Sequence, residues 1–228
     1  MDAEESKQEA ALSALSLLPE EGVIGLGTGS TTRFFIEAVG ELVRGGRKLT
    51  GVPTSQRSRE QAEQCGIPLL DDAGPWTIEV CVDGADEVSD ELDLIKGGGG
   101  AHTREKIVNQ QARTNVIIVD QSKLSRLLGE KRAVPLEVVR FGHRSTAALL
   151  AKFGRPELRE IAGQPFVTDS GNFIYDLACG PIESPALFER RLRELPGVVE
   201  TGLFCARADV VIVAGESGVR QLKRSALG

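Results

Sequence analysis

Short runs of consecutive apolar residues recur along this chain, and polar segments of helical length separate most of them. An apolar run of about four to eight residues is typical of a strand buried on both faces of a sheet. The pattern predicts strands at residues 22–27, 47–55, 66–70, 78–86, 115–122 and 209–215, with helices at 31–46 and 55–66. Strands that alternate with helices indicate an α/β fold, here a doubly wound, mostly parallel sheet.

The middle of the chain follows a different order. "VPLEVVRFG" predicts a strand, "STAALLAKFG" a helix, and "PFVTDSGNFIYDL" a hairpin that turns at Asp169–Asn172. A helix in "SPALFERRLRELPG" and a strand in "VVETGLF" follow. This β-α-β-β-α-β order is that of a small ferredoxin-like α+β unit. We therefore predict a main α/β domain of residues 1–130 plus 206–228, interrupted by an inserted α+β domain at residues 131–205.

The chain ends and the rare residue types restrict the class of protein. The first 22 residues predict an amphipathic helix that ends near Pro19, and they lack the basic start of a signal peptide. No run of 18 apolar residues occurs, so no membrane span is expected. The 4 cysteines form no CxxC pair, which disfavours zinc and disulfides and fits a reducing cytoplasm. With only 2 histidines, a histidine-based metal site or a Ser-His-Asp triad is also disfavoured.

The charge of the chain bears on its partners. The net charge is −6 and the sequence pI is about 5.2. Nucleic acids need a basic surface, so we expect no nucleic-acid partner. A small anion needs only a local cluster of donors, which this balance allows.

Polar residues gather where the predicted strands end. The first strand runs into "GTGSTT", the second into Thr54-Ser55, a later one into "DGAD", and the next into "DQSK". Ligands of open α/β sheets bind beyond the carboxyl ends of the strands. We therefore expect one edge of the sheet to collect hydroxyls, glycine amides, aspartates and lysines.

The stretch "GLGTGSTT" (25–32) is a junction of strand, loop and helix. Glycine amides and a helix N-terminus favour an anion, and Ser30, Thr31 and Thr32 add hydroxyl donors. An ordinary helix cap with a tight glycine turn is the alternative. The match to the dinucleotide pattern GxGxxG is weak, and no acidic residue ends the next strand, so a single phosphate fits better.

An acidic motif and a lysine-glycine motif follow. Asp83 and Asp86 in "DGAD" are close enough to serve as acid/base groups or to hold a divalent cation, and solvated turn acids are the alternative. Lys96 precedes four consecutive glycines, Gly97–Gly100, which we call the tetraglycine loop. Its bare backbone suits close approach of a ligand, against the alternative of a flexible surface loop.

Glu105 falls in the first turn of the helix predicted in "HTREKIVNQQA", where the helix N-terminus stabilises a carboxylate. An ordinary N-terminal acid is the alternative. His102 is expected to cap or pack rather than to react, and Lys123 is either a ligand contact or a surface cation. A phosphate cradle, acids and a lysine without a cysteine nucleophile suit proton transfer, as in aldose–ketose isomerisation.

The motifs "GLGTGSTT", "VDGADEV", "LIKGGGGAHTREKIV", "VDQSKL", "VPLEV", "TDSGNFIYD" and "LPGVVETGLF" occur in this order over nearly the whole chain. Together they resemble the type A ribose-5-phosphate isomerase family. The resemblance implies interconversion of D-ribose 5-phosphate and D-ribulose 5-phosphate through an enediolate, without metal or other cofactor. It also implies a cytoplasmic enzyme of the non-oxidative pentose phosphate pathway that forms a homodimer or homotetramer.

By the same resemblance, Glu105 is the base, with Asp83, Asp86 and Lys96 as further catalytic residues. The substrate-binding residues that it implies are Thr28, Gly29, Ser30, Thr31, Asp83, Gly84, Ala85, Asp86, Lys96, Gly97, Gly98, Gly99 and Lys123. Lys7 aligns loosely with a lysine that reaches the phosphate. "AHTREK" departs from the family pattern by its His-Thr, and "LACGPIESP" by its glycine and prolines.

Two rival functions remain open on the sequence. A methyltransferase is suggested by "IGLGTGS", but it leaves the tetraglycine loop and "DGAD" unexplained. A sugar-phosphate sensor without catalysis would share the fold, although the presence of Glu105 disfavours it. Incubation with ribose 5-phosphate separates the three, because a sensor binds it without conversion.

Overall fold

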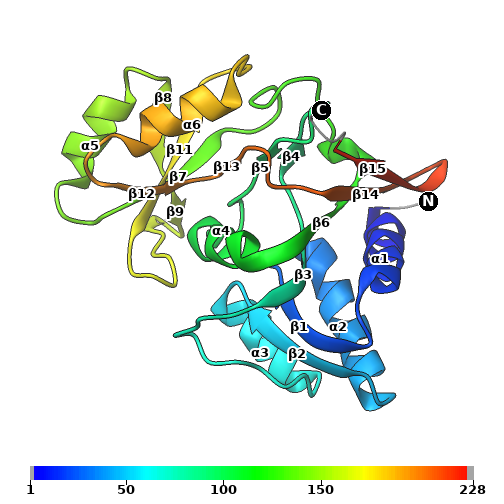
Figure 1. Ribbon diagram of the computed structural model, residues 1–228. Helices are drawn as coiled ribbons and strands as arrows, with labels where there is room; N and C mark the ends of the chain where they lie inside the picture. Colours follow the sequence, from blue (N-terminus) through cyan, green and yellow to red (C-terminus); the bar gives the residue numbers. More distant parts are fainter. Residues whose placement is uncertain (1–2, 225–228) are drawn as a thin grey trace. The chain divides into compact units, whose positions relative to one another are not determined.

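The computed structural model describes residues 3–224 and divides the chain into two compact units (Figure 1). Unit 1 consists of residues 1–85, 104–123 and 207–228, and unit 2 of residues 86–103 and 124–206. Each unit is built around its own sheet.

Unit 1 contains a six-stranded sheet with the order β15-β14-β6-β3-β1-β2. Its strands are β1 (Glu21–Leu26), β2 (Lys48–Pro53), β3 (Ile78–Asp83), β6 (Ala112–Asp120), β14 (Val210–Gly215) and β15 (Gly218–Lys223). All neighbours are parallel except β14 and β15, which form an antiparallel pair at one edge. The buried strands are apolar throughout because helices cover both faces of the sheet.

The helices of unit 1 are α1 (Ala3–Ala14), α2 (Ser30–Arg44), α3 (Gln56–Gln64) and most of α4 (His102–Gln111), with the 3-10 turns η1 (Leu15–Leu17) and η2 (Gln121–Lys123). One core joins α1 and α2 to the face of the sheet that carries Ile24, Val80 and Val82. On the opposite face, Val108 of α4 packs with Cys81 in a second cluster. Alternation of side chains along β3 accounts for this division, since Val80 and Cys81 point to opposite faces.

Unit 2 contains a four-stranded antiparallel sheet with the order β12-β7-β11-β8. In chain order its elements are β7 (Val134–Val138), α5 (His143–Leu150), β8 (Arg155–Leu158), β11 (Phe173–Ala178), α6 (Pro185–Arg193) and β12 (Val198–Thr201). The predicted fold class and the β-α-β-β-α-β order are confirmed, but the second strand is β8 at Arg155–Leu158 rather than the predicted hairpin arm at residues 165–168. Leu150 of α5 and Leu192 of α6 share a core with alternate residues of β7 and β11, so both helices cover one face of this sheet.

Short strands complete unit 2. A three-stranded sheet joins β4 (Glu87–Val88), β5 (Leu94–Ile95) and β13 (Leu203–Phe204), and a two-stranded sheet joins β9 (Glu160–Ile161) and β10 (Gln164–Pro165). The apolar pattern did not identify these strands individually. A strand of two residues is too short to show the alternation of buried and exposed side chains.

Three details of the predicted elements are wrong. Residues 66–70 form no named strand and contribute only an isolated bridge between Leu69 and Gly51. In the predicted hairpin, the arm before the turn makes one bridge, Val167 to Phe173, whereas β11 pairs along its length with β7 and β8. The edge strand β15 was not predicted, since only "GVRQLK" with its mixed polarity encodes it.

The units differ from the predicted domain limits in two stretches. Residues 86–103, which hold the tetraglycine loop, and residues 124–130 are grouped with unit 2 rather than with the main sheet. Hydrogen bonds explain the second shift, because the buried carboxylate of Glu87 accepts from the N–H groups of Gly129, Lys131 and Arg132. Compact units are not necessarily folding domains, so the division at residues 130 and 206 stays a prediction.

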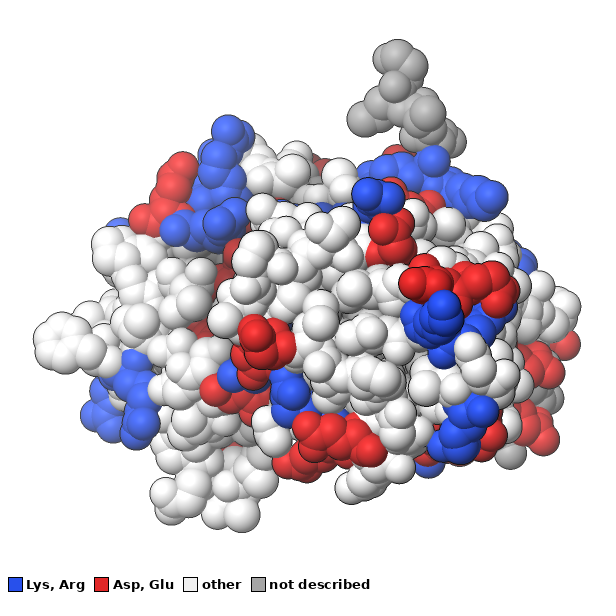
Figure 2. Space-filling view, turned by 60° about the horizontal axis from the view of Figure 1, so that its bottom comes forward, with Lys and Arg blue, Asp and Glu red and all other residues white. Residues whose placement is uncertain are grey.

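Surface charge is mixed on the face drawn in Figure 2, where basic and acidic side chains lie in small neighbouring groups. Among the described residues, none of the helices combines the length and the apolar content needed to cross a bilayer.

Candidate active site

The end of β3 in unit 1 holds Asp83 against the first glycine-rich turn. Its Oδ1 accepts hydrogen bonds from the backbone N–H groups of Thr28, at 3.0 Å, and Gly84, at 2.7 Å. A Cβ on Gly27 would lie 2.2 Å from that same oxygen, so only glycine fits there. The first predicted loop and the start of the second are thus joined directly. These two backbone donors fix the orientation of the buried carboxylate.

The side chain of Thr28 joins a cluster of hydroxyls. Its Oγ1 lies 2.8 Å from that of Thr54, 2.7 Å from Ser55 Oγ and 3.1 Å from Ser58 Oγ. Ser55 also caps α3 by accepting from the N–H of Ser58 at 3.1 Å. The expected gathering of hydroxyls at the ends of β1 and β2 is therefore present, with the Thr28 side chain bound to protein groups rather than projecting from the loop.

Helix α2 begins at the residues predicted to hold an anion. Gly29 is its N-cap residue, with φ at 144° and no side-chain cap, and Ser30 starts the helix. Ser30 is exposed and Thr31 is 9% exposed. The first N–H groups of a helix have no partner within the helix and carry its partial positive charge.

Glu105 lies at the carboxyl edge of the sheet in unit 1. Val108 of α4 packs over β1, since a Cβ on Gly25 would meet its Cγ1 at 2.9 Å, and Gly25 is in register with Cys81 of β3. Residue 112, directly after α4, is paired with Ile78 at the start of β3, so α4 runs opposite to the strands. Glu105 is one turn before Val108 and on the same face of the helix.

The level of Glu105 along the sheet follows from helix and strand geometry. Three helical residues rise about 4.5 Å, and the two strand residues from Cys81 to Asp83 rise about 6.6 Å. The buried Glu105, 3% exposed, therefore lies close to the level of Asp83. The catalytic roles given to Glu105 and Asp83 stay predictions.

Lys7 and Lys123 line one hollow of unit 1. The hollow has a volume of about 420 Å³ and is lined by Ala3, Ser6, Lys7, Asp120, Gln121, Ser122, Lys123, Gly215 and Glu216. The Nζ of Lys7 lies 2.9 Å from Glu4, and Glu4 also accepts from Arg33 of α2 at 3.3 Å. Glu4 thus links Lys7 to Arg33 of helix α2, and the phosphate contact expected for Lys7 stays a prediction.

The tetraglycine loop lies in unit 2 together with Asp86. The Oδ2 of Asp86 accepts from the N–H of Gly98 at 2.7 Å, and the Asp86 N–H donates to the carbonyl of Ile95 at 2.8 Å. Protein contacts require glycine at three positions: a Cβ would meet the His102 ring at 2.7 Å from Gly97, Asp86 at 2.6 Å from Gly98, and Phe166 at 2.4 Å from Gly100. Packing therefore explains most of the run that the sequence analysis attributed to ligand approach.

Lys96 and His102 are both buried in unit 2. The Nζ of Lys96 lies 5.5 Å from the ring centroid of Phe204, a cation–π contact. The Nε2 of His102 is 3.3 Å from the carbonyl oxygen of Glu200. His102 thus packs under the tetraglycine loop, as expected, and the His-Thr that departs from the family pattern has a structural use here.

Comparison with known proteins identifies the family. The family model for ribose 5-phosphate isomerase A (phosphoriboisomerase A) matches residues 50–218. A curated Ribose-5-phosphate isomerase A from Thermomicrobium roseum is 46% identical over 228 residues, which cover 99% of this chain and 96% of the relative. The chain belongs to the ribose 5-phosphate isomerase A family.

Further relatives agree with this assignment. The Ribose-5-phosphate isomerase A of Gloeobacter violaceus is 46% identical, with 99% of each chain covered. A solved D-ribose-5-phosphate isomerase in complex with phospho-erythronic acid has a TM-score of 0.95 and 41% identity, over 98% of this chain and 100% of that one. Ribose 5-phosphate isomerase A from Methanocaldococcus jannaschii has a TM-score of 0.92 and 38% identity, over 97% and 100%.

Two polar groups of this isomerase were missed by the sequence analysis. The carboxylate of Glu137, 1% exposed, accepts from the hydroxyls of Thr103 and Thr168 and from the amide of Asn172. Arg159 binds Asp176 and the carbonyls of the tetraglycine loop. The available signal was the single acid inside each of two apolar strands, "VPLEV" and "FIYDL", which points to the face away from the helices.

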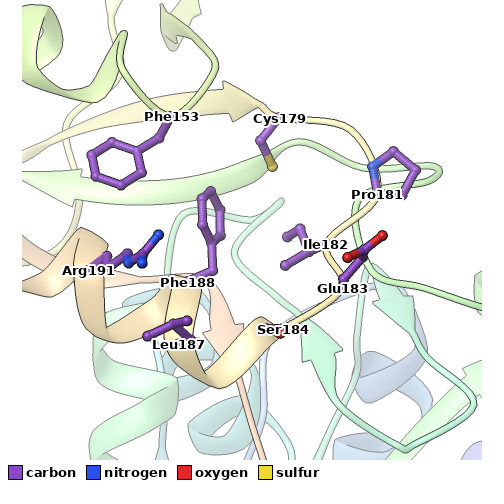
Figure 3. Close-up of a pocket in the computed structure, with 9 residues that line it drawn as sticks. All are labelled: Phe153, Cys179, Pro181, Ile182, Glu183, Ser184, Leu187, Phe188 and Arg191. Carbon is purple, nitrogen blue, oxygen red and sulfur yellow. The ribbon is translucent and has the colours of Figure 1, made fainter.

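A second hollow, in unit 2, is lined by none of the predicted site residues (Figure 3). It has a volume of about 380 Å³, and its lining includes Phe153, Cys179, Phe188 and Arg191. The rings of Phe153 and Phe188 meet edge to face, with centroids 6.0 Å apart. Burial raises the pKa of the Cys179 thiol, so this cysteine is mainly protonated at neutral pH.

Proposed function

We propose that this isomerase interconverts D-ribose 5-phosphate and D-ribulose 5-phosphate by proton transfer through an enediolate, without a metal ion. The placement of the buried Glu105 near the level of Asp83, at the carboxyl edge of the unit 1 sheet, carries this proposal. The relatives are named as isomerases of ribose 5-phosphate, which supports this choice of sugar phosphate.

In the proposed reaction Glu105 is the base. It takes the proton from C2 of the open-chain aldose, and the electron pair moves to form the enediolate, with negative charge on the oxygen at C1. Glu105 then returns the carbon-bound proton to C1. The hydroxyl at C2 passes its proton to the negatively charged oxygen at C1, which becomes a hydroxyl as C2 becomes the carbonyl carbon of the ketose. A positioned base of this kind typically contributes about 10²–10⁴-fold to the rate.

The other predicted residues receive supporting roles. Gly29, Ser30 and Thr31, at the start of α2, bind the phosphate through helix N–H groups and hydroxyls. Lys7 and Lys123 add positive charge from the neighbouring hollow. Asp83 and Asp86 bind the sugar hydroxyls and assist ring opening, and Lys96 stabilises the charge that develops on the oxygen at C1. Thr28, Gly84, Ala85 and Gly97–Gly99 contribute backbone groups.

The wider assignments belong to the same proposal. We place the enzyme in the non-oxidative pentose phosphate pathway and in the cytoplasm, as a homodimer or homotetramer. Among the described residues, no group of three His, Cys, Asp or Glu side chains is arranged to hold a metal ion. Incubation of the purified protein with ribose 5-phosphate tests the activity directly. Ketose should form, whereas binding without conversion would favour the sugar-phosphate sensor.

A further inference from the structure

One guanidinium contacts two successive carbonyls of the tetraglycine loop. The Nη1 of Arg159 donates to the carbonyl oxygen of Gly97 at 2.7 Å and to that of Gly98 at 3.2 Å. Arg159 is more than 60 residues away from these glycines along the chain, but all three lie in unit 2. Hydrogen bonds from a charged donor are about twice as strong as neutral ones.

Arg159 is itself fixed in place. Its Nε and Nη2 bind both carboxylate oxygens of Asp176, at 2.9 and 2.5 Å, and its side chain is only 15% exposed. Its backbone N–H donates to Ile174 at 2.8 Å, and its carbonyl accepts from Phe166 at 2.8 Å. The bidentate pair, together with the two backbone hydrogen bonds of residue 159, leaves the guanidinium little freedom to follow a moving loop.

The planarity of the peptide bond converts these contacts into an orientation of amides. In a trans peptide the N–H points opposite to the carbonyl of the preceding residue. The peptide that joins Gly97 to Gly98 is held from both sides, because Arg159 binds its oxygen and Asp86 binds its N–H at 2.7 Å. The same rule directs the N–H of Gly99 away from Arg159, since the carbonyl of Gly98 points toward it.

Gly99 is the member of the run that remains available to a ligand. It is exposed, and within the residues that the structure describes no protein group accepts a hydrogen bond from its N–H. An oriented backbone N–H of this kind stabilises negative charge that develops on a substrate oxygen. Without Arg159, the flexible backbone of consecutive glycines would let this amide rotate.

We propose that Arg159, braced by Asp176, is a positioning residue for the isomerase reaction: it orients the Gly97–Gly98–Gly99 peptides so that the N–H of Gly99 faces the enediolate oxygen. This inference rests on the proposed function for the identity of the substrate. Arg159 itself does not touch the substrate in this account.

The test compares Arg159→Met with the wild-type enzyme and with a matched control. Methionine replaces the unbranched apolar stem of arginine and removes every donor. Arg155 begins strand β8 (Arg155–Leu158), which ends just before Arg159; its side chain is 77% exposed and forms an ion pair with Glu157. Arg155→Met therefore removes a nearby arginine without removing a contact to the tetraglycine loop. Conversion of ribose 5-phosphate gives kcat and KM, and calorimetry gives the Kd of phospho-erythronic acid and of inorganic phosphate.

Arg159→Met should lower kcat by about 10- to 100-fold, less than or equal to the loss of a whole oxyanion donor. Phospho-erythronic acid carries a planar, anionic carboxylate that mimics the enediolate. The Kd of phospho-erythronic acid should therefore rise by about 10-fold in Arg159→Met, while the Kd of inorganic phosphate stays unchanged. Arg155→Met should match the wild type, and Arg159→Lys should recover part of the loss. If the role of Arg159 were purely structural, Arg159→Met would lower the melting temperature and change the Kd of both ligands alike. An unchanged kcat in folded Arg159→Met would overturn the proposal.

The two proposals fail separately. If the wild type converts ribose 5-phosphate and folded Arg159→Met does so equally well, only the role of Arg159 is lost. If the wild type converts none, the proposed function fails. A crystal structure of Arg159→Met then decides the orientation alone: rotated Gly97–Gly98 and Gly98–Gly99 peptides support it, and peptides in their present orientation refute it.

Discussion

The backbone N–H of Thr28 donates a hydrogen bond of 3.0 Å to the carboxylate of Asp83, which lies 55 residues further along the chain. This contact joins the ends of β1 and β3, which are neighbouring parallel strands. It depends on Gly27, because any side chain there would occupy the position of the carboxylate. The glycine before Thr28 therefore positions an acid, in addition to allowing the turn into α2.

Gly27→Ala should both destabilise the protein and impair the reaction. The added Cβ would lie 2.2 Å from Asp83 Oδ1 and 2.6 Å from Asp83 Cα, so backbone as well as side chain must move. Overpacking of this kind costs about 1–3 kcal/mol, which corresponds to a fall in melting temperature of roughly 2–4 °C per kcal/mol at this chain length. Thermal unfolding and kcat/KM measure the two effects. Gly84→Ala is the control for stability alone, since its added Cβ would come no closer than 3.9 Å to the nearest non-neighbouring atom. Equal melting temperatures of Gly27→Ala and Gly84→Ala would refute the argument.

Lys96→Ala should raise KM and lower kcat together. The ammonium group lies against Phe204 in unit 2 and is 3% exposed, so the protein fixes its position before substrate arrives. Loss of a fixed cation removes stabilisation of both bound substrate and enediolate. Lys48→Ala removes an exposed lysine of β2 and should leave both constants at wild-type values. Wild-type kinetics in Lys96→Ala would contradict the role given to this residue.

Removal of divalent cations should leave turnover unchanged. The proposed steps move protons among side chains, backbone amides and sugar oxygens, and none of them uses a metal ion. Dialysis against EDTA, followed by assay in metal-free buffer, makes the comparison. A loss of activity that Mg²⁺, Mn²⁺ or Zn²⁺ restores would show that a metal takes part.

Alkylation of Cys179 should be slow at neutral pH and accelerate in alkaline solution. Burial raises the pKa of this thiol above its ordinary value of 9.0, and the thiolate is the reactive form. The folded state therefore favours the protonated thiol, and this preference adds stability below pH 9.0 that is lost as the pH rises through the raised pKa. Iodoacetamide labelling followed by mass spectrometry gives the rate at Cys179 between pH 7 and 10. Labelling at pH 7 as fast as that of free cysteine would contradict the assignment.

The sequence predicted the parts of the fold that rest on long apolar periods. Strands β1, β2, β3, β6 and β14 and helices α2, α3 and α4 were found because their buried faces repeat over whole elements. Residues 66–70 were misassigned because "GIPLL" is apolar like a strand but pairs with β2 through only one bridge, at Leu69. The strand β15 was missed because it pairs along a single edge and keeps several side chains exposed.

Residues of the candidate site were predicted wherever a local motif encodes them. Asp83, Asp86, Lys96 and Glu105 stand in such motifs, and their roles stay predictions. Arg159 and Glu137 could not be found in this way, because their partners at Gly97, Gly98 and Thr103 are distant in sequence and meet them only through the fold of unit 2. A lone arginine after a short strand carries no signal of its own.

The most direct test of the account is the turnover of Glu105→Gln on ribose 5-phosphate, because glutamine keeps the shape of the side chain and removes the base. Glu21→Gln, at an exposed position of β1, is the control. We predict that Glu105→Gln folds, binds ribose 5-phosphate with nearly wild-type affinity, and loses about 10²-fold or more in kcat, the share of the rate that a general base supplies. A kcat equal to that of the wild type would contradict the assignment of Glu105 as the base.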